Sequence, residues 1–162
     1  MSGLEVLEYT IEMIMPGLLE AALSDLPGKL ARAGIQGLVI DKVYSFAQLV
    51  PMSMNLPFVQ IWAVLPSHPS GAAPPAFASW PHDTTPEALA RNVEGMKRYG
   101  GFLTPMVRIA QAYAGRVGLD IDWADPSATS SKLAVISQTP EVFDYPGIPQ
   151  GQRALIGNLG NL

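Results

Sequence analysis

GLVID at 37–41 and LPFVQIWAV at 56–64 are the strongest structural signals in this sequence. Both are apolar runs with little polar alternation, a pattern typical of strands covered on both faces in a parallel sheet. KLAVIS at 132–137 is a third run of this kind. Between the first two lies a stretch with helical character, 44–54. Because parallel strands need crossover connections, this order predicts an α/β fold.

Helical spacing of apolar residues surrounds these strands. Before the first strand, the spacing predicts helices over 3–15 and 17–32, interrupted or kinked at Pro16-Gly17. After the second strand, a proline-rich loop of about twenty residues leads to Thr85-Pro86-Glu87, a typical helix start. That helix is expected to break at Gly100-Gly101 and to resume from 102 to 117. The tail has weak strand character at 154–156.

Composition excludes several classes of protein. The chain has 162 residues, which fits one domain, and it is 48% hydrophobic and 15% charged, which argues against disorder. The net charge is −4 without any block of Lys or Arg, so a nucleic-acid partner is not expected. No cysteine is present. Repeated prolines break the long uncharged stretch, so no integral membrane span is expected, and the predicted location is cytoplasmic.

Two blocks of sequence then carry a family resemblance. In the first block, 39–80, an acidic-ended strand at Asp41 is followed by Leu56-Pro57-Phe58-Val59, by Pro74-Pro75 and by Trp80. The second is SKLAVISQTPEVFDYPG at 131–147. Together they resemble the bacterial macrolide-type and zeaxanthin-type glycosyltransferases of the UDP-glycosyltransferase superfamily. The resemblance covers about 15–148 and implies part of the two-domain GT-B fold.

The resemblance implies an incomplete protein. It makes 1–149 a partial acceptor-binding Rossmann-like domain, with a parallel sheet between helices on both faces, and 150–162 a divergent tail. The family's catalytic histidine segment and nucleotide-sugar domain match no part of this sequence. We therefore expect no catalytic residue, cofactor or metal here, and no activity from this chain alone. The full reaction would transfer a sugar from a UDP-sugar to a hydroxyl of a lipophilic acceptor.

Candidate acceptor-binding residues come from the strand ends and the proline-rich loop, because ligands of parallel sheets bind beyond the carboxyl ends of strands and apolar pockets are lined by aromatic groups. They are Asp41, Trp62, Leu65, His68, Pro74, Phe77 and Trp80. Simpler roles compete with this one. Asp41 could cap a helix or bond a loop amide, Trp62 could be strand core that the loop covers, and His68 and His82 could lie on the surface.

The pair Asp120 and Asp122 resembles a metal-binding motif, but a calcium loop would need a glycine and a glutamate that are missing here. A surface turn before Pro126 explains the pair better. Two alternatives to a truncated acceptor domain remain open. One is a free-standing module that binds apolar ligands. The other is a subunit completed by a separate donor-domain chain, which predicts an exposed apolar face; self-association is a further expectation.

Overall fold

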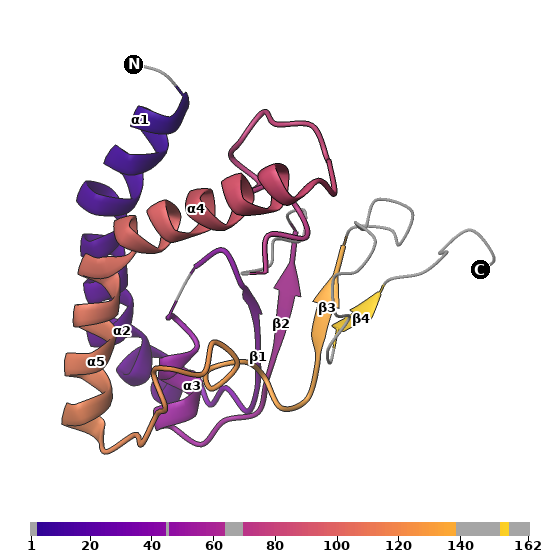
Figure 1. The fold of residues 1–162 in the computed structure, drawn as a ribbon. Coiled ribbons are helices and arrows are strands. Elements are labelled where there is room, and N and C mark those ends of the chain that lie inside the picture. The colour runs from indigo at the N-terminus through magenta and orange to yellow at the C-terminus, as the bar shows by residue number, and fades with distance from the viewer. Residues whose placement is uncertain (1–2, 45, 64–69, 139–152, 156–162) are drawn as a thin grey trace.

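The computed structural model describes residues 3–44, 46–63, 70–138 and 153–155 (Figure 1). Helices and parallel strands alternate along these residues, as the apolar runs predict. The elements are α1 (Gly3–Tyr9), the π-helix η1 (Thr10–Ile14), α2 (Met15–Arg32), β1 (Leu38–Asp41), α3 (Leu49–Ser53), β2 (Phe58–Trp62), α4 (Pro86–Phe102), α5 (Thr104–Val117), β3 (Val135–Ser137) and β4 (Arg153–Leu155).

The four strands form one parallel sheet in the order β1-β2-β3-β4. Leu38 pairs with Phe58, and Ile61 pairs with Ile136. The three predicted strands are therefore confirmed, and β4 falls on the weak signal at the tail. The strands are shorter than the apolar runs that predict them, because each run continues into the neighbouring loop.

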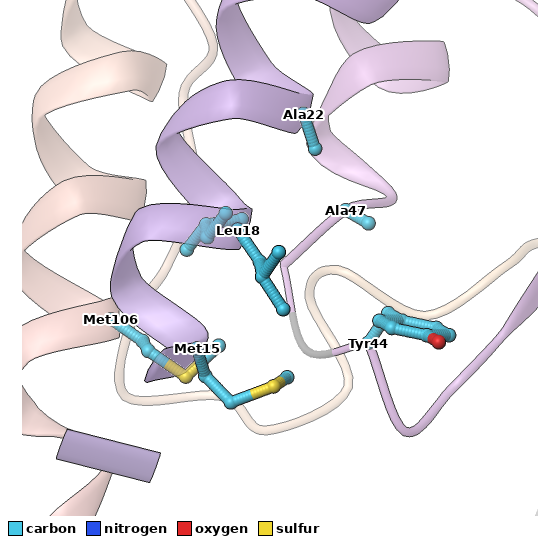
Figure 2. A pocket seen from close by; sticks show the side chains of 7 residues that line it. Met15, Leu18, Ala22, Tyr44, Ala47 and Met106 are labelled. Carbon is cyan, nitrogen blue, oxygen red and sulfur yellow. The ribbon is translucent and has the colours of Figure 1, made fainter. Parts of the chain in front are cut away.

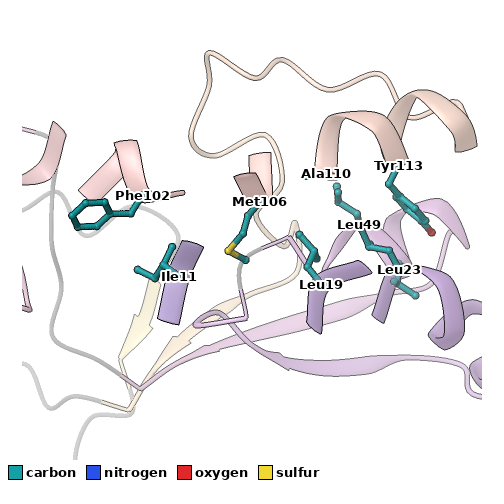
Figure 3. Packing of buried hydrophobic residues seen from close by; sticks show 9 residues of the cluster. Ile11, Leu19, Leu23, Leu49, Phe102, Met106, Ala110 and Tyr113 are labelled. Carbon is teal, nitrogen blue, oxygen red and sulfur yellow. The ribbon is translucent and has the colours of Figure 1, made fainter. Parts of the chain in front are cut away.

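The apolar core lies among the helices rather than between helices and sheet (Figure 3). Its fully buried members include Leu49 of α3 and Met106 and Ala110 of α5. Leu19 and Leu23 of α2 pack against them. Helices α2, α3 and α5 thus form one tightly packed cluster, which we call the helical cluster. Among the described residues, no helix is long and apolar enough to cross a membrane.

The described helices gather on one side of the sheet (Figures 1 and 3). The prediction of helices on both faces is not met by these residues, and Val39 in β1 is largely exposed. Strand order explains this arrangement. The steps from β1 to β2 and from β2 to β3 run in the same direction, and right-handed crossovers then place α3, α4 and α5 on the same face.

The predicted interruption at Pro16-Gly17 takes a different form. The helix continues past the proline, but the turn before it is a π-helix in which the Met15 N–H donates to the Thr10 carbonyl. Pro16 therefore lies in the first turn of α2, where a missing N–H leaves no hydrogen bond unmade. The proline shifts the hydrogen-bond register instead of separating two helices.

Two other helix boundaries also differ from prediction. Helix α4 runs through Gly100-Gly101 and ends at Phe102, because Pro105 has no N–H to continue the helix and lies instead in the first turn of α5. Helix α3 begins only at Leu49, because Phe46 has a left-handed φ of 71° that helix cannot accommodate. The predicted start of α4 is confirmed, since the Thr85 side chain accepts a hydrogen bond from the Ala88 N–H.

Candidate functional site

The carboxyl edge of the sheet brings two predicted site residues to the ends of neighbouring strands. Asp41 ends β1 and Trp62 ends β2. Because the strands are parallel, both residues lie at the edge where ligands of open α/β sheets bind. Ser137, which pairs with Trp62 in the register, ends β3 at the same edge and is fully buried. We call Asp41, Lys42, Gln60, Trp62 and Ser137 the strand-end group.

Asp41 holds a turn. One carboxylate oxygen, Oδ1, accepts a hydrogen bond from the Val43 N–H at 2.9 Å, and the Asp41 carbonyl accepts one from the Tyr44 N–H. Of its expected roles, bonding a loop amide is therefore confirmed. The carboxylate shapes the chain as it leaves β1 and so fixes where Lys42 lies.

Trp62 is half-buried and lies beneath a cation. The Lys42 Nζ is 4.9 Å from the centre of its ring, and the Lys42 N–H donates to the Ile61 carbonyl. The indole Nε1 is buried and has no hydrogen-bond acceptor within the described structure. A buried N–H without an acceptor is unfavourable by about 1–3 kcal/mol, so we expect its acceptor to come from outside the described residues.

Gln60 provides a second donor of the same kind. Its side chain is fully buried, and Oε1 accepts from the Ser131 N–H at 2.9 Å. The Ser131 hydroxyl in turn donates to the Phe58 carbonyl. The Gln60 Nε2 is buried without an acceptor in the described residues. Because Gln60 and Trp62 are two residues apart on one strand, both side chains leave the same face of β2.

Sequence reasoning missed Gln60, Lys42 and Ser137. The signal for Gln60 was a single amide inside the apolar run 56–64, which could have been read as a buried polar group with a specific partner. Lys42 and Ser137 carried no comparable signal. Their position depends on the pairing of β1 with β2 and of β2 with β3.

The proline-rich loop packs against α4. A Cβ built on Gly95 would lie 2.9 Å from the Pro75 ring and 3.0 Å from the Trp80 ring, so both rings press directly on the helix backbone. Phe77 stacks on Tyr99 at 5.6 Å between ring centres, and burial raises the Tyr99 pKa. The loop thus gathers Pro75, Phe77 and Trp80 on one helix, where they have a packing role.

Polar contacts fasten the same loop. The Asn92 side chain, fully buried in α4, donates to the Gly71 carbonyl at 2.9 Å, and the Arg91 guanidinium lies 4.9 Å from the Trp80 ring centre. Pro74 is buried. Leu65 and His68 lie outside the described residues. Of the seven predicted site residues, Asp41 and Trp62 share the strand-end group, whereas Pro74, Phe77 and Trp80 belong to the loop on α4.

Three pockets formed by described residues lie elsewhere. The first is an apolar cavity of about 40 Å³ between α2, α5 and the segment after β1 (Figure 2). Met15, Leu18 and Tyr44 lie around it, and its volume suits little more than one water-sized group. Larger surface grooves of about 490 and 450 Å³ lie between α2 and α5 and at the amino ends of β2 and β3. None of the three is lined by the strand-end group.

A turn begins at Asp122 before Pro126, as predicted, with the Asp125 N–H donating to the Asp122 carbonyl. The Asp122 carboxylate accepts from the Ala124 N–H at 2.9 Å, and the exposed Asp125 carboxylate accepts from the Ser127 N–H. These hydrogen bonds to Ser127 lower the pKa of Asp125. Within the described part of the chain, no three His, Cys, Asp or Glu side chains gather in a way that could hold a metal ion.

Comparison with known proteins adds one relative. The chain is 26% identical over 132 residues to the zeaxanthin glucosyltransferase of Pseudescherichia vulneris. The match indicates a distant relationship to a glycosyltransferase. It covers 82% of this chain but 32% of that protein, so the chain spans about a third of its curated relative's length. No family model matches the chain. No solved structure matches it either.

Proposed function

We propose that this chain forms part of the acceptor-binding half of a GT-B glycosyltransferase of the UDP-glycosyltransferase type. The match to zeaxanthin glucosyltransferase, which extends over most of the chain, carries the proposal. The parallel sheet supports it, because the strand-end group lies where such sheets bind ligands. The same match favours this role over a free-standing binding module or a subunit completed by another chain.

The reaction proposed for the whole protein is an inverting sugar transfer. A base takes the proton of the acceptor hydroxyl, and the oxygen then bonds to the anomeric carbon of the sugar. The bond from that carbon to the diphosphate oxygen of the UDP-sugar breaks, and UDP leaves with the electron pair. Neither the base nor the donor site is assigned to residues of this chain, so these 162 residues alone are expected to bind without turnover.

Within this proposal, the residues of this chain position the acceptor. Trp62 is the strongest candidate, because its buried Nε1 has no acceptor within the described structure and its ring provides apolar contact area. The Gln60 Nε2 lies on the same strand face and could donate to the same polar group. Asp41 holds the turn that sets Lys42 above the indole. Leu65, His68, Pro74, Phe77 and Trp80 are proposed to complete the acceptor side.

A binding experiment with two matched carotenoids tests the proposal. Zeaxanthin carries hydroxyl groups that β-carotene lacks, so the pair separates hydroxyl recognition from apolar contact. Trp62→Phe keeps an aromatic ring but removes the Nε1 donor. We expect it to weaken binding of zeaxanthin by about two- to ten-fold, the worth of one hydrogen bond, and to leave binding of β-carotene unchanged.

Trp123→Phe is the matched control, because Trp123 is 36% exposed and packs on Phe46, with ring centres 6.2 Å apart. Binding can be followed by quenching of the intrinsic tryptophan fluorescence. The proposal fails if the unaltered chain binds neither carotenoid, or if Trp62→Phe and Trp123→Phe change zeaxanthin binding equally.

A further inference from the structure

The register of the sheet sorts the strand-end group by face. Residues paired in register in a parallel sheet point to the same face, and successive residues of a strand alternate between the two faces. Trp62 pairs with Ser137 and lies two residues after Gln60, so these three side chains share one face. Asp41 pairs with Ile61, so its carboxylate points to the opposite face.

Lys42 joins the face of Trp62. It follows Asp41 directly, its N–H donates to the Ile61 carbonyl, and its Nζ lies 4.9 Å from the centre of the indole ring. A cation in this position lies over the flat face of the ring, whereas the Nε1–H bond lies in the plane of the ring. Both Lys42 and Trp62 are half-buried, so a ligand can reach them at the carboxyl edge. Lys42 thus brings a positive charge to the indole without taking up its N–H.

The side chains on this face offer hydrogen-bond donors. The Trp62 Nε1 and the Gln60 Nε2 are both buried, and neither has an acceptor within the described part of the chain. The other polar atom of Gln60, Oε1, already accepts from the Ser131 N–H at 2.9 Å. The Asp41 carboxylate, on the opposite face, accepts from the Val43 N–H. Two N–H donors and an ammonium therefore lie on one face of the carboxyl edge, and the carboxylate of the strand-end group lies on the other.

A carboxylate matches these donors better than a hydroxyl does. An ionised carboxylate only accepts hydrogen bonds, and its two oxygens offer about four lone-pair sites, so it can accept from more than one N–H. A hydroxyl also brings an O–H of its own, which needs an acceptor when it is buried. Hydrogen bonds to an ionised oxygen are shorter and about twice as strong as those between neutral groups. The charge of Lys42 adds an attraction that a neutral hydroxyl does not receive.

The neighbours of these donors are apolar. Ile40 and Val135 pair with Gln60 from the two adjacent strands, so both aliphatic side chains lie beside it on the same face. The ring of Trp62 provides further apolar area. A ligand that fills this place therefore combines an anionic head with an apolar body. A nucleoside diphosphate fits less well, because it brings more than one negative charge to a group that holds one lysine, and its nucleoside is polar.

On the basis of the proposed function, which brings the acceptor to this edge, we infer that the acceptor carries a carboxylate. The strand-end group binds this carboxylate through the Trp62 Nε1, the Gln60 Nε2 and the ammonium of Lys42. The substrate class is then a lipophilic hydroxy acid, whose carboxylate is held at the strand ends while its hydroxyl, elsewhere on the molecule, receives the sugar. The Trp62 donor also binds a hydroxyl when no carboxylate is present, but more weakly.

Two retinoids that share one polyene separate the two head groups. Retinoate ends in a carboxylate and retinol in a hydroxyl, and at about pH 8 the carboxylate is ionised. We expect the unaltered chain to bind retinoate about ten-fold more tightly than retinol, because its hydrogen bonds are charge-assisted. Binding can be followed by quenching of the fluorescence of the three tryptophans.

Lys42→Met removes the ammonium and keeps an unbranched side chain over the ring. It should weaken binding of retinoate about ten-fold and change binding of retinol by less than about two-fold. Lys132→Met is the matched control, because Lys132 lines the groove at the amino ends of β2 and β3, the opposite end of the sheet. It should leave binding of both retinoids unchanged. Both variants keep the three tryptophans and should keep the unaltered circular dichroism spectrum.

Equal affinity for the two retinoids, or no binding of either, would overturn the inference, as would equal effects of Lys42→Met and Lys132→Met on retinoate binding. Displacement of retinoate by UDP that depends on Lys42 would also overturn it, because the bound oxyanion would then belong to the sugar donor. The two carotenoids test the proposed function separately. If zeaxanthin binds more tightly than β-carotene but retinoate is not preferred, the proposed function stands and the carboxylate site fails. If retinoate is preferred but the carotenoids bind alike, the carboxylate site stands and the proposed hydroxyl recognition fails.

Discussion

The helical cluster and the sheet bury different kinds of side chain. In the cluster, Leu49 and Met106 are fully buried by neighbouring helices. In the sheet, Phe58 and Val135 are buried, but so is the amide of Gln60, which accepts a hydrogen bond from the Ser131 N–H, while Val39 on the other face lies exposed. Stability should therefore depend on apolar packing in the cluster and on hydrogen bonding in the sheet. An apolar residue in a strand of this protein does not by itself mark the core.

The greatest loss of stability is expected in the cluster. Met106→Ala removes a side chain that is 1% exposed, so we expect it to lower the free energy of unfolding by about 2–5 kcal/mol. Val39→Ala in the sheet should change it by less than about 0.5 kcal/mol. Urea unfolding measures both. Equal losses at the two positions would show that cluster and sheet do not differ in this way.

The buried polar side of the sheet comes next. Ser131→Ala removes the donor to the Phe58 carbonyl and the acceptor of the Leu133 N–H, and should lower the free energy of unfolding by about 1–3 kcal/mol. The adjacent Ser130 is less buried and provides the control, with Ser130→Ala expected to change stability by less than about 0.5 kcal/mol. If the two alanine variants unfold at the same urea concentration, hydrogen bonds do not hold this part of the sheet.

Two glycines of α4 repeat the contrast between packed and open positions within one helix. A methyl group on Gly95 would press on Pro75 and Trp80, so Gly95→Ala should lower the free energy of unfolding by about 1–3 kcal/mol. A methyl group on Gly100 would have nothing within 4 Å, so Gly100→Ala should raise the free energy of unfolding by about 0.5–1 kcal/mol. Thermal unfolding of the two variants shows whether each substitution raises or lowers stability. A stabilising Gly95→Ala would mean that the loop does not pack on α4.

A weaker effect is expected from pH. Burial raises the pKa of Tyr99, so the folded chain holds this proton more tightly than the unfolded chain. The resulting stabilisation is fully present below pH 10.0, the ordinary pKa of tyrosine. It is lost as the pH rises through the pKa of Tyr99 in the folded chain. Tyr99→Phe should flatten this alkaline loss, measured as unfolding free energy against pH. Tyr44→Phe, at an exposed tyrosine, serves as control and should retain the slope of the unaltered chain.

The sequence predicted the order of elements but not how they cover one another. Runs such as 37–41 are apolar at nearly every position, so they identify buried-type strands without saying which face a helix covers. That choice depends on strand order, which no local pattern contains. The helix boundary was wrongly predicted at Gly100-Gly101 because a glycine pair only weakens a helix, whereas Pro105 has no N–H with which to continue one.

The candidate site was predictable only in part. Asp41 and Trp62 could be placed at the strand ends, since each lies at or near the end of an apolar run. The sequence could not show that the nitrogen donors of Gln60 and Trp62 lack acceptors, because the partners of a buried side chain come from distant parts of the chain. Ser131, for example, lies 71 residues from Gln60 and donates to its Oε1. For Pro74, Phe77 and Trp80, aromatic content indicated a lining role, but Gly95 on α4 is what receives the ring of Trp80.

The π-helical turn at Thr10–Ile14 also sets a rotational phase. Each residue of an α-helix turns the chain by about 100°, so an extra residue in one turn rotates everything before it by that angle relative to α2. Deleting one residue of this turn would restore a uniform helix and swing Val6 and Tyr9 round the axis. The ion pair of Glu8 with Arg98 would separate as well. A single codon in this turn therefore decides which way the first helix faces.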